Sequence, residues 1–185
     1  MNKIARMLPG VSLLGLVLAY GSWAQAGPND TGLPTFSDAK AAQHVYTAVG
    51  VIKNNDMETA FICTNLDTVV VNIGVEVFNK LGFLVNNPAT GTGIFQGNGE
   101  VLNVAVGGTV TIVTSGTALL ADDEQISVGQ NLRNGSGRVV ATSKNISCTA
   151  MLLDEVHRIV APDPNANDPL EPPPTAVNLP LIRVP

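Results

Sequence analysis

Side chains that could do chemistry are few in this 185-residue chain and lie far apart in it. Only two histidines occur, His44 and His157, and neither lies in a recognisable local motif. A hydrolase needs a nucleophile and a base that orient each other, and the G-x-S-x-G pattern of one large hydrolase class is missing. We therefore predict no catalytic residue, and we expect both histidines to be surface or edge residues.

The densest acidic cluster is Asp122-Asp123-Glu124. Neighbouring carboxylates could serve as acid and base, or bind Ca²⁺ through their oxygens. The alternating D-x-D-x-D-G spacing of a calcium loop is absent, so a solvated acidic loop is the default interpretation. Asp122, Asp123 and Glu124 are therefore only weak metal candidates, and no cofactor is predicted.

The first residues have the three parts of a secretory signal. Two basic and no acidic residues come first, a mainly apolar run of nine follows at 11–19, and small residues stand at Ala24 and Ala26. A membrane helix needs roughly 20 apolar residues. We therefore expect residues 1–26 to be a signal peptide cut after Ala26, rather than an uncleaved anchor or a buried helix. The mature chain is then expected in the periplasm or outside the cell, with no membrane span.

Removal of the signal leaves an acidic chain. Two of the ten basic residues and none of the fifteen acidic residues leave with it, so the formal charge becomes −7. Affinity for nucleic acid comes largely from Lys and Arg that neutralise phosphates. We therefore predict no nucleic-acid partner.

The two cysteines, Cys63 and Cys148, both belong to the mature chain. In an oxidising compartment an even pair favours one disulfide. Strand alternation places Cys63 on the side of Phe61, and Cys148 on the side of Ile146 and Ala150, so both thiols should point at a core. Two buried free thiols are the alternative. A metal site is disfavoured because two cysteines are half a ligand set and no C-x-x-C pair is present.

Most of the mature chain has the pattern of β-strands. From Gln43 onward, β-branched residues are frequent and apolar and polar residues alternate with a period of two. The clearest case is 68–78. One side of this segment carries Val69, Val71, Ile73, Val75 and Val77, and the other side carries Asn72, Gly74 and Glu76. That pattern is typical of a half-buried antiparallel strand.

Further strands are expected around them. In the first strand, Val45, Thr47, Val49 and Val51 share one side. Segments 100–106 and 109–115 indicate a hairpin across Gly107-Gly108. The other expected strands are 58–65, 81–85, 137–143 and 146–153.

Seven or eight short strands without a convincing helix favour an all-β fold. We predict an immunoglobulin-like antiparallel β-sandwich over residues 43–160, with a small β-barrel as the alternative. Residues 27–42 are interpreted as an extended leader, and residues 161–185 as a Pro-rich tail.

The tail contains eight of the chain's 12 prolines and has an apolar end at 177–184. Proline cannot donate to a ladder, so the tail is expected to be extended and outside the sheets. Its apolar end could dock on its own domain or on another chain, and a frayed terminus is the alternative.

Four strand segments carry a resemblance to a group of bacterial proteins. They are Phe61-Ile62-Cys63-Thr64-Asn65, Val75-Glu76-Val77-Phe78, Gly137-Arg138-Val139-Val140-Ala141-Thr142-Ser143 and Ile146-Ser147-Cys148-Thr149-Ala150. Over roughly residues 58–153 the chain resembles a set of uncharacterised exported bacterial proteins, which look like single β domains with two similarly placed cysteines. The resemblance implies a bacterial envelope or extracellular origin, and no functional residue is transferred from it.

Taken together, these features favour an exported non-enzymatic envelope or extracellular module. It would act by protein binding or self-assembly, with itself or another envelope or extracellular protein, through the C-terminal tail. The alternatives are a small-ligand or ion-binding protein that uses the loops 86–99 and 116–135, and a hydrolase of extracellular polymers, whose site would leave no sequence motif.

Overall fold

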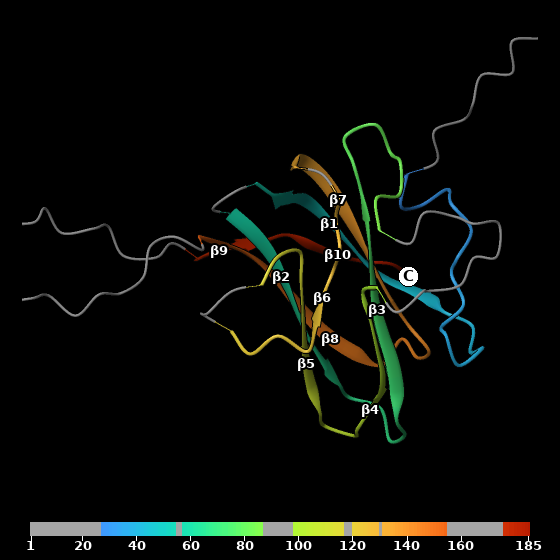
Figure 1. The fold of residues 1–185 in the computed structure, drawn as a ribbon. Helices are drawn as coiled ribbons and strands as arrows, with labels where there is room; N and C mark the ends of the chain where they lie inside the picture. Colours follow the sequence, from blue (N-terminus) through green and yellow to red (C-terminus); the bar gives the residue numbers. More distant parts are fainter. Residues whose placement is uncertain (1–26, 55–56, 87–97, 117–119, 130, 155–175) are drawn as a thin grey trace, which may run out of the picture.

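The chain folds into two stacked β-sheets of five strands each (Figure 1). This is a computed structural model, and it describes residues 27–54, 57–86, 98–116, 120–129, 131–154 and 176–185. The described part is all-β and contains no helix, and the sheets do not close into a barrel. The prediction of an all-β, two-sheet fold is confirmed at this level.

The first sheet has the order β10-β1-β7-β3-β4 and is antiparallel throughout. Its strands are β10 (Leu181–Arg183), β1 (Gln43–Lys53), β7 (Leu132–Ala141), β3 (Val71–Phe78) and β4 (Glu100–Val104).

The second sheet has the order β6-β5-β2-β8-β9. Its strands are β6 (Glu124–Gln125), β5 (Thr109–Val113), β2 (Met57–Asn65), β8 (Ile146–Asp154) and β9 (Ala176–Leu179). Only the short β5–β6 pair is parallel.

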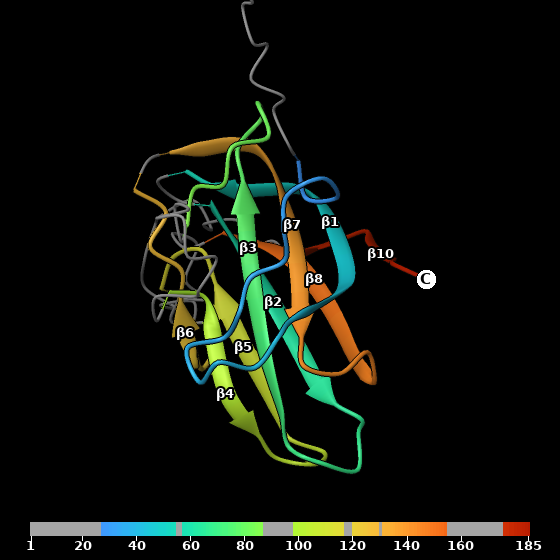
Figure 2. The same cartoon turned by 90° about the vertical axis from the view of Figure 1, so that its right-hand side faces the viewer.

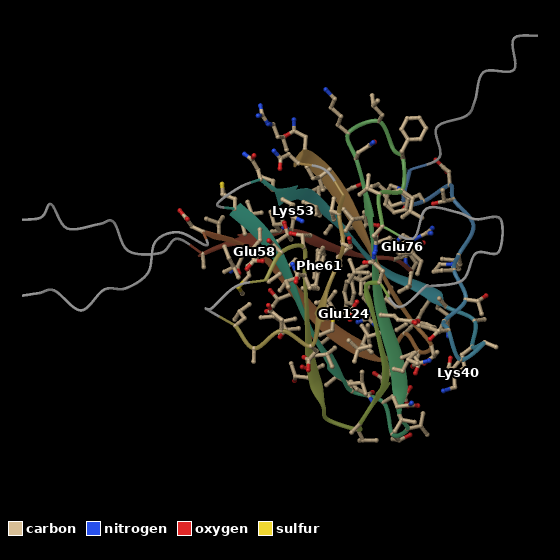
Figure 3. The ribbon with its side chains drawn as sticks, viewed as in Figure 1. Lys40, Lys53, Glu58, Phe61, Glu76 and Glu124 are labelled. Carbon is tan, nitrogen blue, oxygen red and sulfur yellow. A yellow bond between two sulfur atoms is a disulfide. The ribbon has the colours of Figure 1, made fainter. Side chains whose placement is uncertain are left out.

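The main hydrophobic core lies between the two sheets. Phe61, on β2, is fully buried there (Figure 3). A Cβ added to Gly137, on β7 of the other sheet, would come within 2.9 Å of the Phe61 ring. Glycine at 137 therefore makes the room that this ring occupies.

The outer face of the first sheet is covered by the N-terminal residues of the described chain. Figure 2 shows this segment, in blue, crossing the face of β3. Phe36 and Ala42 pack on Val140 in a small cluster of their own. All eight residues of β3 are consequently buried, including Asn72 and Glu76. The expectation of a half-buried strand at 68–78 was wrong because another segment, and not water, lies against its polar face.

The alternation expected in the first strand also breaks. Register shifts occur between Val49 and Val51 and at two other points of the β1–β7 pair, and Gly50 has a φ of 84°. Each bulge changes which side the following residues face. Val45 and Val51 are buried, whereas Val49 is 43 % exposed.

The hairpin expected across Gly107-Gly108 was wrong, because β4 and β5 belong to different sheets. The turn is a corner tied to the end of β2. The Asn65 side-chain amide donates to the carbonyls of Val104 (3.0 Å) and Ala105 (3.1 Å), and Gly107 N donates to Asn65 O (3.0 Å). These bonds direct the chain from one sheet to the other.

The short strand expected over 81–85 is reduced to one bridge between Phe78 and Leu84. Asn79 makes the turn instead, because its side-chain oxygen accepts from the backbone N–H groups of Leu81 (2.9 Å) and Phe83 (3.1 Å). Such side-chain bonds compete with a strand ladder.

Candidate functional site

The C-terminal segment, residues 176–185, adds one strand to each sheet on the same side of the sandwich. β9 pairs with β8, with Ala176 opposite Leu153 and Leu179 opposite Ala150. Pro180 follows, and β10 then pairs with β1 in the other sheet. The expectation that the tail lies outside the sheets was wrong for these residues. Proline is tolerated where it need not donate to a ladder. Pro180 is the single residue between β9 and β10, where the chain passes from one sheet to the other.

Few side chains hold the C-terminal segment. Leu179 and Leu181 are partly buried and pack against the main core. Val177 and Ile182 are exposed, at 50 % and 57 %. Backbone pairing and two leucines therefore carry most of the attachment.

Arg183 adds a polar contact at the end of the segment. Its guanidinium lies 5.6 Å from the centroid of the Tyr46 ring and donates to Lys144 O at 2.8 Å. Val184 N donates to Val45 O at 2.9 Å, and Lys144 Nζ donates to Pro185 O. Hydrogen bonds that use the backbone fix register with little dependence on side-chain identity.

The surface under the segment is built by both sheets. The Tyr46 hydroxyl, on β1, donates to Ile146 O on β8 at 2.9 Å, and this bond is buried. It joins the two strands that accept the C-terminal segment. The Tyr46–Ile146 bond lies within the body of the sandwich, and Arg183 Nη1 of the C-terminal segment donates to the same hydroxyl at 3.4 Å.

A buried ion pair lies on the outer face of the first sheet. Arg138 Nε donates to Glu76 Oε2 at 2.6 Å, and both side chains are almost fully buried. The guanidinium also donates to the carbonyls of Pro28 (3.0 Å), Thr31 (2.8 Å) and Gly32 (2.9 Å). Burial raises the pKa of Glu76 above its usual value, and Arg138 opposes that shift. Arg138 thus fastens the N-terminal segment to the sheet.

His44 lies beside this cluster on β1 and has local partners. Its Nε2 is 3.2 Å from Tyr46 O and 3.0 Å from the Thr47 hydroxyl. Burial, followed by the charge of Arg138, lowers the pKa of His44. Both partners lie within three residues of His44 on the same strand. His157 lies outside the described residues.

The acidic cluster has mainly backbone partners. Asp123 Oδ2 accepts from Thr111 N at 2.7 Å, and Glu124 Oε1 accepts from Gly99 N at 3.0 Å. Asp122 is exposed. Of the three weak metal candidates, Asp123 is therefore bonded to β5, and Glu124, on β6, is bonded to the residue just before β4. Within the described ranges, no group of three or more His, Cys, Asp or Glu side chains could hold a metal ion.

The two loops considered for ligand binding are described only in part. Residues 87–97 and 117–119 lie outside the described residues. Asn86 is buried, and its side chain bonds Val77 N (2.6 Å), Val75 O (2.8 Å) and Asn98 O (3.3 Å). A shallow depression of about 320 Å³ lies nearby, lined by Asn79, Phe83, Leu84, Val85 and Gly129. None of these five described residues carries a titratable side chain.

The expected disulfide is confirmed between Cys63 and Cys148. The two residues lie directly opposite each other on β2 and β8, so the bond joins neighbouring strands of one sheet. Cys63 is buried in the core, and Cys148 packs against it while partly exposed. A disulfide is typical of oxidising compartments.

Exposed apolar side chains gather at the end of the sandwich where β2 meets β3 and β4 meets β5. They are Leu66, Val69, Val70 and Val106, each between 53 % and 59 % exposed. The Asn65 side-chain amide donates hydrogen bonds to carbonyls in both turns, the one between β2 and β3 and the one between β4 and β5. In the part of the chain that the structure describes, no helix is long and apolar enough to cross a membrane.

Sequence reasoning missed the Arg138–Glu76 pair. In the sequence, these two charged residues lie on the face of their strands that does not carry the apolar side chains. The same pattern is expected of a strand whose polar face is solvated, so it does not predict a buried ion pair. Searches of protein-family models, curated proteins and solved structures find no match to this chain.

Proposed function

We propose that this chain is an exported, non-enzymatic module of the bacterial envelope or extracellular space, which acts by binding protein strands at the β8–β1 edge. The observation that carries the proposal is that one short segment supplies an edge strand to both sheets. A sheet edge presents unpaired N–H and C=O groups, which is a general basis for recognition by strand addition.

Export is supported by the signal-like segment 1–26 and by the disulfide. An immunoglobulin-like type for the sandwich remains a prediction, supported by two facing, mainly antiparallel sheets.

The test uses a recipient, residues 27–175, which lacks the C-terminal segment, and a labelled peptide of residues 174–185. We expect saturable one-to-one binding, measured by fluorescence anisotropy, because the edge at Tyr46 is built by the domain itself. The recipient's fold is checked first by its circular dichroism and by its intact disulfide.

Matched peptides show whether binding uses the described contacts. Leu179→Asn/Leu181→Asn removes both core-facing side chains and should abolish binding, whereas Ile182→Lys alters an exposed position and should not. If a folded recipient binds none of the peptides, the proposed function is wrong. The double variant Val70→Lys/Val106→Lys of the recipient tests the exposed apolar side chains in the turns at one end of the sandwich. If this variant still binds the natural peptide, that surface is excluded as the binding site.

A further inference from the structure

We infer that the C-terminal segment is exchanged between copies of this chain, so that residues 176–185 of one copy complete the β8 and β1 edges of another. The inference rests on the proposed function and names the partner, a second copy of the same chain. The register within an exchanged pair is the one seen here, with Leu179 opposite Ala150 and Ile182 opposite Thr47.

The connection between β8 and β9 is far longer than their pairing requires. Leu153 lies opposite Ala176, and neighbouring antiparallel strands can be joined by a two-residue turn. Here the connection takes up all of 155–175, which lies outside the described residues. Fully extended, a connection of that length spans roughly 70 Å, about twice the diameter of a domain of this size. The segment can therefore reach the edge of a neighbouring copy.

The composition of that connection is typical of an extended spacer. Half of the chain's 12 prolines lie within 155–175, and none of its 18 glycines does. Pro-rich linkers act as semi-rigid extended spacers, whereas Gly-rich linkers fold back readily. From this composition we expect a stiff spacer, which would lower the effective concentration of the segment at an edge only one strand away and favour an edge at a distance.

The described contacts of the segment are made with the body of the sandwich. Leu179 and Leu181 pack on its core, and Arg183 contacts Tyr46 and Lys144. The same contacts form whether the segment and the sandwich belong to one chain or to two. Exchange therefore sacrifices none of these contacts, and protein concentration decides between the two arrangements.

The test uses two variants of the full mature chain, Thr47→Cys and Ile182→Cys, which carry different mass tags. These positions lie opposite each other on β1 and β10, and the Ile182 side chain is exposed. The two variants are unfolded with the native disulfide intact, refolded together and oxidised. We expect a covalent heterodimer on non-reducing gels, with a yield that rises with protein concentration.

Three controls define the result. The double variant Thr47→Cys/Ile182→Cys, oxidised at low concentration, should bridge within one chain, which shows that the pair can react. Ile182→Cys mixed with Val106→Cys, an exposed position in the turn between β4 and β5, should give several-fold less heterodimer. Deleting residues 161–172 shortens the connection by more than half and should lower the heterodimer yield several-fold.

The outcomes separate the two proposals. If the double variant bridges within one chain but the mixture gives no heterodimer at any concentration, strand exchange between copies is overturned. Peptide binding by the recipient would then still support the proposed function, with a different protein as the strand donor. If the recipient binds no peptide, the proposed function itself fails.

Discussion

At Arg138, one guanidinium joins three parts of the structure. It pairs with Glu76 on the neighbouring strand, lies 5.4 Å from the centroid of the Phe78 ring, and donates to three carbonyls of the N-terminal segment. A buried charge without such partners would be very unfavourable. The N-terminal segment is therefore part of the folded unit.

We expect Arg138→Ala to lower the free energy of unfolding by about 3–5 kcal/mol, because it leaves Glu76 buried without its cation. Urea unfolding followed by circular dichroism measures this. The matched control is Arg133→Ala, on the exposed part of the same strand, which should change stability by about 0.5 kcal/mol or less. A loss below about 1 kcal/mol at position 138 would contradict the account given for the cluster.

His44 should make stability depend on pH. Its pKa is lowered from 6.5 in the folded chain, so the unfolded chain binds the proton more tightly. The contribution of His44 to stability is therefore fully present above pH 6.5 and declines as the pH falls below it. Urea unfolding at pH 7.5 and at pH 5.5 should show a loss for the natural chain that is smaller in His44→Gln. Equal losses in the two chains would argue against a lowered pKa.

At the scale of elements, alternation predicts strands well wherever one face meets the core. The segment 58–65 became β2 and 146–153 became β8, almost with the expected bounds. Alternation failed where the backbone departs from regular geometry, as at the β1 bulges. The hairpin prediction at Gly107-Gly108 failed for another reason. Two glycines indicate a turn, but they do not determine whether the next strand pairs with the previous one or joins the other sheet.

The disulfide belongs to this scale because it fixes β2 to β8. Reduction, or Cys63→Ala/Cys148→Ala, should lower the free energy of unfolding by about 4–5 kcal/mol, the chain-entropy value for the 85-residue separation. Chemical denaturation with and without reductant measures the loss. A loss below about 1 kcal/mol would mean that the reduced, unfolded chain keeps residual structure that holds the β2 and β8 segments near each other without the bond.

At the scale of the whole molecule, both ends of the described chain are structural. Residues 27–42 cover the outer face of one sheet, and residues 176–185 complete the edges of both. The role of residues 27–42 could not be derived from the sequence, whereas docking of the tail's apolar end on its own domain was one of the alternatives that the sequence left open. In the sequence, the side of β3 that carries Asn72 and Glu76 has the pattern of a solvated face. The prolines of the tail predict an extended segment outside the sheets, although it contains the two short strands β9 and β10.

Deleting residues 176–185 should accelerate amide hydrogen exchange locally. The amides that lose ladder partners lie in Tyr46–Ala48 of β1 and in Ala150–Leu153 of β8. We expect their exchange to rise by about tenfold or more, while β3 and β4 change little. Mass spectrometry of peptic fragments resolves these regions. Unchanged rates at β1 and β8 would place the C-terminal segment elsewhere.

The position of β1 also sets the order in which the fold can be completed. Ala48 of β1 lies opposite Gly137 of β7 and Leu181 of β10, both of which come far later in the chain. Chains dominated by such distant pairings fold slowly, in milliseconds to seconds. If the chain is exported N-terminus first, as proposed above, β1 would stay without either partner through most of its passage, and the first sheet would be complete only when residues 181–183 had crossed.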